Sequence, residues 1–206
     1  MAAVEDAARR SQASARRPLV IAGLVVAAVA LAVGAWVWTA GQQRQEVAVS
    51  MSEPPTCTGS QVVWRRLPGV GYPVPIMQVR ESMDCQVRLR VVNRGRWSVQ
   101  VKEVVLPFMG PHAGPGTRVA QLAGVRPVTD DESGGTDAVF PVNRQVAVGQ
   151  TAVFPVHFTF RPNGCTGGTL WFEQMPQVTV SALGWTGTVS GDQVIAFQGT
   201  AASDCA

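Results

Sequence analysis

The chain has 206 residues, of which 46% are hydrophobic and only 15% are charged, and its formal net charge is +3. This composition excludes a disordered chain, which needs low hydrophobicity and high charge, and a coiled coil, which needs abundant Glu and Lys. Glycine (21) and proline (14) are too frequent for a protein of long helices, so we expect one domain, with or without an appendage.

The first forty residues divide into a polar tail and an apolar segment. Residues 1–17 are rich in Ala, Arg and Ser and are too few to fold, so they are predicted to be a disordered cytoplasmic tail. Residues 18–40 contain no charge, and a helix of this length spans about 34 Å, which is enough to cross a membrane. Four arginines precede this segment and only Arg44 follows it closely, so the positive-inside rule places the N-terminus in the cytoplasm and the C-terminal part outside the cell.

A cleaved signal peptide is the alternative for the apolar segment. Signal peptides have a shorter hydrophobic region, of about 7–15 residues, and small residues before the cleavage site. Here the apolar run is longer, and Trp38 stands where a small residue is needed, so we predict a retained transmembrane helix. Small residues spaced four apart would allow two such helices to pair, and a homodimer through this helix is a further hypothesis; these residues are Gly23, Ala27, Ala30 and Gly34.

The rest of the chain is predicted to be a linker followed by one extracytoplasmic domain. Residues 41–56 end in Pro54-Pro55 and have the composition of a linker. Residues 57–206 contain short segments of alternating polarity separated by Gly, Pro and Asn turns, as expected for strands. The segment 85–93 is typical of a half-buried strand in an antiparallel sheet: Cys85, Val87, Leu89 and Val91 share one face, and Gln86, Arg88 and Arg90 share the other.

Two later patterns extend this β-rich interpretation. After an Asn-Arg-Gly-Arg turn, the alternation resumes with Trp97 facing the core, so the segments on either side of the turn are interpreted as a hairpin. In the run 152–160, Pro155 cannot donate a ladder hydrogen bond, which predicts an edge strand or a bulge. Seven or more such strands predict an all-β domain, an immunoglobulin-like antiparallel β-sandwich, with a jelly roll or small barrel as the alternative.

Four cysteines follow the apolar segment, at Cys57, Cys85, Cys165 and Cys205. Outside the cytoplasm, cysteines usually form disulfides, and three pairings are possible. The pairs Cys57–Cys85 and Cys165–Cys205 are favoured because they join neighbours in sequence. A zinc site would need closely spaced cysteine pairs, which the sequence lacks.

Residues suited to catalysis or metal binding are sparse. His112 lies in a Gly- and Pro-rich loop without a nucleophile motif, and His157 lies on the polar face of a strand, so no enzymatic activity and no cofactor are predicted. A Ca²⁺ site in the stretch 130–137 or a copper site near His112 and Met109 is the metal-binding alternative, although the acidic spacing does not match an EF-hand. The acidic candidates are Asp130, Asp131, Glu132 and Asp137.

Arginines form a second candidate binding feature, at Arg88, Arg90, Arg94 and Arg96. Clustered guanidinium groups could bind phosphate-bearing wall polymers or lipid headgroups, and the alternative is an ordinary solvated sheet face. The part of the chain after the apolar segment has 13 basic and 12 acidic residues, hence +1, which is not the charge of a nucleic-acid-binding protein.

The stretch 85–110 has an alternating strand, Asn-x-Gly, a second alternating strand, Leu-Pro and a Gly loop, and it resembles a bacterial extracellular Ig-like pattern. The segment 146–160 (VAVGQTAVFPVHFTF) is similar to a later strand pair of such modules, and the ratio of 16 Arg to one Lys resembles that of actinobacterial proteins. The resemblance implies a single-pass membrane protein with an adhesion, scaffolding or accessory role, and it assigns no site residues. We therefore expect a non-catalytic binding or scaffolding module of the cell envelope, whose partner is an envelope protein or wall polymer. The alternative is a small-ligand or metal (Ca²⁺ or Cu) sensor.

Overall fold

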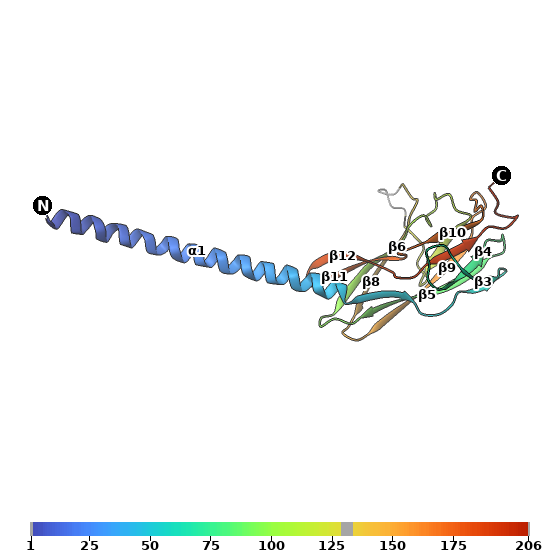
Figure 1. The fold of residues 1–206 in the computed structure, drawn as a ribbon, viewed down its shortest axis with the longest axis horizontal. Coiled ribbons are helices and arrows are strands. Elements are labelled where there is room, and N and C mark those ends of the chain that lie inside the picture. Colours follow the sequence, from blue (N-terminus) through green and yellow to red (C-terminus); the bar gives the residue numbers. More distant parts are fainter. Residues whose placement is uncertain (1, 129–133, 206) are drawn as a thin grey trace. The chain divides into compact units, whose positions relative to one another are not determined.

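The computed structural model describes residues 2–128 and 134–205, with side chains described from Ala22 onward (Figure 1). The chain separates into two compact units, Met1–Gln42 and Gln43–Ala206. The described elements are α1 (Ala2–Gln45), β1 (Val47–Met51), β2 (Thr56–Thr58), β3 (Val62–Arg66), β4 (Pro73–Gln78), β5 (Asp84–Asn93), β6 (Val99–Leu106), β7 (Thr117–Leu122), β8 (Ala138–Val146), β9 (Thr151–Phe160), β10 (Thr169–Phe172), β11 (Gln177–Ala182), β12 (Trp185–Ser190) and β13 (Ile195–Gln198).

The N-terminal unit is formed by α1. Within this helix, Ala22–Gln45 is long and apolar enough to cross a membrane, with a mean hydropathy of 2.0, a property it shares with signal sequences. Large apolar side chains between Leu24 and Val33 are exposed around the helix, as expected of a membrane-spanning helix or a signal sequence. The helix begins at Ala2, so the structure differs from the disordered tail expected for residues 1–17.

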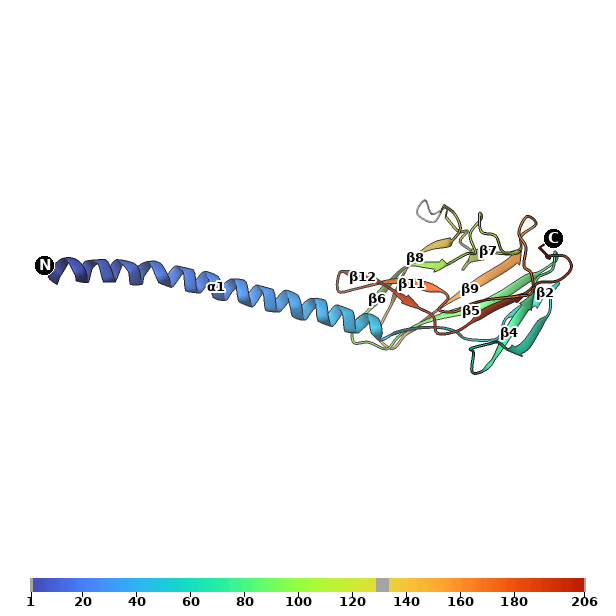
Figure 2. The same cartoon turned by 45° about the horizontal axis from the view of Figure 1, so that its top comes forward.

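The second unit contains three sheets (Figures 1 and 2). The first has the order β1-β5-β9-β7, with β2 also pairing with β5; the second is β10-β13-β4-β3; the third is β12-β11-β6-β8. Among the strand pairs of the described residues, β13–β4 is parallel and the others are antiparallel, so the antiparallel prediction holds with one exception. The mostly β architecture with an N-terminal apolar helix and two disulfides is therefore as predicted.

One buried core draws on all three sheets. Its largest side chains are aromatic, and Phe158 of the first sheet contacts Phe197 of the second with ring centroids 5.4 Å apart. Phe140 of β8 brings the third sheet into the same core. A smaller apolar cluster, which includes Val74 and Ile76, lies on the other face of β4. Alternation along β5, β9 and β11 sets which of their side chains are buried, as the period-two patterns predict.

The predicted hairpin between the segments around residues 85–91 and 97–101 is wrong. β5 pairs with β1, β2 and β9, whereas β6 pairs with β8 and β11 in a different sheet. The connecting turn leads from one sheet to the other, and the buried side chain of Asn93 holds it by donating to the carbonyls of Trp97 and Val146. Trp97 was expected in the core, but it lies in this turn before β6 begins and is exposed.

Pro155 lies in β9, which is between β5 and β7 in the sheet. The sequence predicts an edge strand or a bulge at this proline. It is opposite Arg88 of β5, while the carbonyl of Pro155 accepts a hydrogen bond from the N–H of Ala123, just past the end of β7. The backbone of Pro155 therefore faces the side of β9 on which β7 has already ended. The register between β7 and β9 shifts nearby, between Val119 and Gln121.

Residues 41–56, which were expected to be a linker, belong mostly to the domain. β1 pairs with β5 over five residues, and Gln43 is already buried. β1 is an alternating strand, with Val47 and Val49 in the core. The sequence analysis did not separate this short strand from the polar residues around it.

The four cysteines form two disulfides, Cys57–Cys85 and Cys165–Cys205, the pairing that sequence order favours. The first joins β2 to β5 at directly opposed positions. The second fastens the C-terminal segment to the loop after β9, where the N–H of Thr166 also donates to the carbonyl of Ser203.

Candidate functional site

The histidine of β9 lies on the outer face of the first sheet. His157 Nδ1 is 3.4 Å from Oδ1 of Asp84, and its Nε2 is 3.4 Å from the amide nitrogen of Gln86. A His–carboxylate pair becomes catalytic when the other ring nitrogen faces a nucleophile or a substrate proton. Here it faces an amide, so the arrangement is that of a polar surface network.

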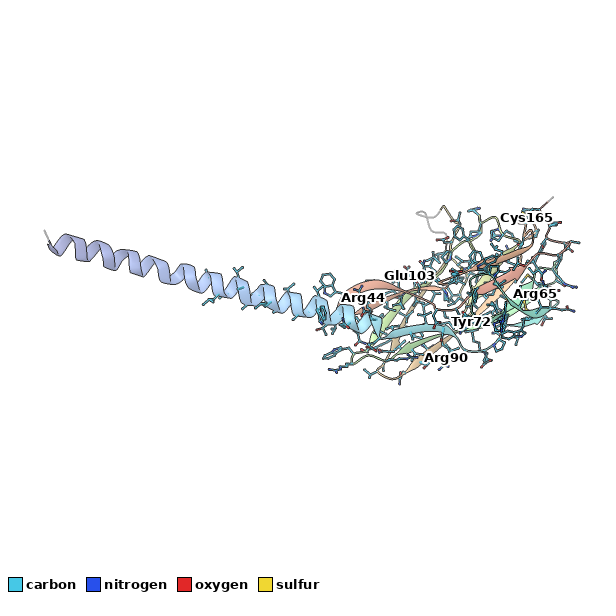
Figure 3. All side chains as sticks on the ribbon, in the orientation of Figure 1. Arg44, Arg65, Tyr72, Arg90, Glu103 and Cys165 are labelled. Atoms are coloured by element: carbon cyan, nitrogen blue, oxygen red, sulfur yellow. A yellow bond between two sulfur atoms is a disulfide. The ribbon has the colours of Figure 1, made fainter. Side chains whose placement is uncertain are left out.

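The four arginines of the candidate basic patch fall into two groups. Arg88 and Arg90 project from the outer face of β5, and Arg90 is labelled in Figure 3. Arg94 and Arg96 lie in the turn that follows β5 and are exposed. Arg88 is paired with Glu53 at 3.1 Å, which neutralises part of the patch. The patch is thus divided between a strand face and a loop.

The two described metal candidates, His112 and Asp137, lie in neighbouring loops. Asp130, Asp131 and Glu132 are outside the described residues. Asp137 accepts a hydrogen bond from the N–H of Phe108 at 3.0 Å, and the N–H of His112 donates to the carbonyl of Gly135. Among the described residues no group of three or more His, Cys, Asp or Glu side chains could hold a metal ion. The buried Met109 sulfur accepts a hydrogen bond from Thr117, as expected for a core residue rather than a copper ligand.

The structure instead reveals a shallow groove of about 230 Å³ between the β3–β4 hairpin and the segment that follows β1. Trp64 stands opposite Pro75 in the hairpin, and its side chain is 56% exposed. Pro54 and Pro55 come from the facing segment. We call this feature the Trp64 groove; it is lined by Met51, Ser52, Glu53, Pro54, Pro55, Trp64, Pro75 and Gln193.

Hydrogen bonds fix the wall of the Trp64 groove that follows β1, and the β3–β4 ladder fixes the opposite wall. The N–H of Met51 donates to Oε1 of Gln193 at 2.6 Å, and the N–H of Ser52 donates to the carbonyl of Arg88 at 2.9 Å. Proline restricts the backbone of the same segment. The groove is therefore preformed, which lowers the conformational entropy lost when a ligand binds.

The rim of the Trp64 groove is polar and charged. Glu53 contributes a carboxylate that is paired with the guanidinium of Arg88, and both side chains are more than half exposed. The amide of Gln193 also faces the groove. Arg65, next to Trp64 in β3, lies at the same end of the domain (Figure 3). An exposed indole beside donors and acceptors can stack on a flat ligand and hydrogen-bond its polar groups.

The sequence patterns assign Trp64 to no site. Glu53, Pro54 and Pro55 belonged to the expected linker, and Gln193 lies 129 positions from Trp64 in the chain. The groove depends on which strands are neighbours, and strand order is not encoded in alternation. The sequence signal that could have indicated an exposed site here is Trp64-Arg65-Arg66. Two arginines in succession place a charge on each face of a strand, which a buried strand would not do.

No protein-family model matches the chain, and no curated protein matches it with significance.

Proposed function

We propose that this protein is a membrane-anchored, extracytoplasmic binding module of the cell envelope, without catalysis of its own, whose domain is an immunoglobulin-like β-sandwich. The observation that carries the proposal is the preformed Trp64 groove, where an indole is held exposed against prolines. The sandwich assignment is supported by a single core shared by three sheets.

The location is supported by two independent features. The apolar part of α1 is long enough to be an anchor. All four cysteines are in disulfides, and disulfides persist in oxidising compartments outside the cytoplasm. The arginine bias before the helix favours an N-terminus inside the cell and a domain outside.

The chemistry of the Trp64 groove favours a wall polysaccharide as the ligand. Its volume of about 230 Å³ is below the about 300 Å³ at which pockets begin to enclose a small molecule, so only part of a ligand enters it. A polymer that lies across the groove satisfies this limit. The apolar face of a sugar ring stacks on Trp64, while its hydroxyls reach Glu53, Arg88 and Gln193.

Co-sedimentation with purified insoluble peptidoglycan tests this function. The full chain in detergent is expected to sediment with the polymer, and Trp64→Ala is expected to weaken binding about tenfold because the stacking surface is lost. Tyr72→Ala is the matched control, since Tyr72 is an exposed aromatic of the same hairpin region that lies outside the groove (Figure 3). If the chain stays in the supernatant, or if the two variants lose binding equally, the proposal is wrong.

The alternative, a Ca²⁺- or copper-binding sensor, rests on the stretch 130–137 and on His112. The described residues contain no group of three or more His, Cys, Asp or Glu side chains that could hold a metal ion, and Asp137 accepts a hydrogen bond from the N–H of Phe108. No observation favours this alternative over the binding module.

A further inference from the structure

The end of the domain where the chain enters it is organised around one buried side chain. Gln43 donates from Nε2 to Oδ1 of Asn93 at 3.1 Å and to the carbonyl of Trp97 at 2.9 Å. Its Oε1 accepts hydrogen bonds from the N–H groups of Arg96 and Trp97. Gln43 therefore fixes the loop 94–98 to the point of entry.

Two more loops are bound to the same point. The side chain of Asn93 donates to the carbonyl of Val146 at 3.0 Å, and the N–H of Gly149 donates to the carbonyl of Asn93 at 2.9 Å. The guanidinium of Arg44 donates to the carbonyl of Thr186 at 2.9 Å. We call the segments 94–98, 147–150 and 183–186 the entry loops, the last of which includes the first two residues of β12. Within the domain, Arg44 and Arg65 lie at opposite ends (Figure 3), so the entry loops are remote from the Trp64 groove.

The entry loops expose large apolar side chains. Trp97 is 52% exposed, Val148 is 53% exposed, and Trp185 is 46% exposed. One such residue on a surface is ordinary, but three on loops that meet at one end of a domain indicate a surface adapted to a less polar environment. Tryptophan prefers the headgroup region of a bilayer, where the indole is partly in an apolar environment and its N–H is hydrated.

The charge of this end is positive. Arg94 and Arg96 are exposed on the loop that carries Trp97, and Arg44 adds a third guanidinium. The three entry loops contain no acidic residue, and Glu46 is the exposed carboxylate just after the point of entry. Three arginines against one glutamate favour an anionic surface.

The length of the connecting chain limits how far this end can lie from the apolar segment. The apolar segment ends at Ala40, and Gln43 is already held inside the domain, three residues later. Three residues span at most about 11 Å when fully extended, whatever direction the chain takes. This reach is comparable to the thickness of one headgroup layer, about 5–7 Å on each side of the hydrocarbon.

We propose that the entry loops bind the surface of the bilayer through anionic phospholipid headgroups, with Trp97 and Trp185 in the headgroup layer and Arg94 and Arg96 on phosphates. This proposal rests on the membrane anchor proposed above. The surface orients the domain so that the Trp64 groove, at the opposite end, faces away from the membrane. A wall polymer would then reach the groove without competing with lipid.

Site-specific photo-crosslinking in vesicles tests the proposal. The full chain, with a benzoylphenylalanine in place of Trp97 or of Trp185, is reconstituted into phosphatidylcholine vesicles with or without phosphatidylglycerol. Flotation first establishes that the chain is anchored. Irradiation is expected to attach phospholipid at both positions, several-fold more than at the matched control positions Trp64 and Tyr72, which are similarly exposed aromatics outside the entry loops.

The outcomes separate this proposal from the proposed function. A chain that floats but gives equal lipid adducts at Trp97 and Trp64 overturns the inference and leaves the anchor intact. Crosslinks from Trp97 or Trp185 to a second protein chain overturn it in favour of a protein interface. A chain that does not float overturns both the anchor and the inference, while peptidoglycan binding is measured separately.

Charge variants test the headgroup chemistry. Phosphatidylglycerol is expected to raise the lipid adduct at Trp97, and the double variant Arg94→Gln/Arg96→Gln is expected to abolish this rise, since each arginine near an anionic surface contributes about fivefold to binding. Arg65→Gln/Arg66→Gln, two neighbouring exposed arginines on β3, is the matched control. An equal effect of the two double variants would exclude a specific role for the entry loops.

Discussion

Asn93 is the residue that most holds together the end of the domain where the chain enters it. Its side chain is fully buried and uses both of its polar atoms: Nδ2 donates to the carbonyls of Trp97 and Val146, and Oδ1 accepts from Gly95 and Gln43. A buried amide with four partners is as fully satisfied as its chemistry allows. Sequence reasoning identified a turn at this asparagine but could not assign its side chain to the protein interior.

We expect Asn93→Ala to lower the free energy of unfolding by about 2–4 kcal/mol, because several buried donors and acceptors lose their partner at once. Urea unfolding of the full chain in detergent, followed by circular dichroism, measures the change. Asn163→Ala, at an exposed turn, is the control and should lie within about 0.5 kcal/mol of the parent. A small effect at Asn93 would show that water replaces these hydrogen bonds.

Arg161 shows the same dependence on long-range contacts at another loop. It is buried, and its guanidinium donates to the carbonyls of Pro111 at 2.8 Å and Thr117 at 3.1 Å. Burial lowers the pKa of Arg161, and the nearby charge of Arg118 acts in the same direction, but an arginine remains protonated at any physiological pH. Arg161 is thus a structural cation that joins the loop before β7 to the end of β9, and nothing in its local sequence indicates this.

At the scale of elements, the sequence predicted which face of a strand is buried better than it predicted which strands pair. Val91 and Val99 are both buried, as the alternation requires, yet the strands that contain them belong to different sheets. A hairpin and a connection between two sheets place the same side chains in the core, because alternation fixes the direction of a side chain and leaves the partner strand open. The Trp64 groove was out of reach for the same reason, since it requires β1, β3, β4 and residue 193 to be neighbours.

The two disulfides act on different elements, and their removal should differ accordingly. The Cys165–Cys205 bond closes a separation of 40 residues and holds the C-terminus. We expect Cys165→Ser/Cys205→Ser to lower the free energy of unfolding by about 4 kcal/mol in the chain-entropy model and to allow a carboxypeptidase to remove the residues after Ser203, whose backbone remains hydrogen-bonded to Thr166. Chemical denaturation and mass spectrometry of the digest measure the two effects.

Cys57→Ser/Cys85→Ser is the control for this experiment. It opens a separation of 28 residues between β2 and β5, so a similar loss of stability, of about 3–4 kcal/mol, is expected without trimming of the C-terminus. Equal resistance of all three proteins to the carboxypeptidase would show that the hydrogen bonds of Ser203, rather than the disulfide, protect the C-terminus.

At the scale of the whole molecule, a retained anchor is consistent with the way in which the domain begins. The domain uses Gln43, three residues after the apolar segment, as a buried hydrogen-bonding centre. Cleavage near Ala40 would place Gln43 within about three residues of a new, charged N-terminus. In a released domain, the two exposed tryptophans of the entry loops would have no membrane surface to contact.

We therefore expect the mature protein to keep its N-terminal helix. Expressed with a C-terminal tag in a bacterium, it should stay in the membrane fraction after alkaline carbonate treatment, retain the mass of the full chain, and lose the tag when intact, wall-stripped cells are treated with protease. Val29→Arg/Leu31→Arg places two charges near the centre of the apolar segment, each costing about 2.5–3.5 kcal/mol there, and should abolish membrane retention. Carbonate-soluble protein that lacks about the first forty residues would instead identify the helix as a signal peptide, and it would remove the basis for a membrane-bound orientation of the Trp64 groove.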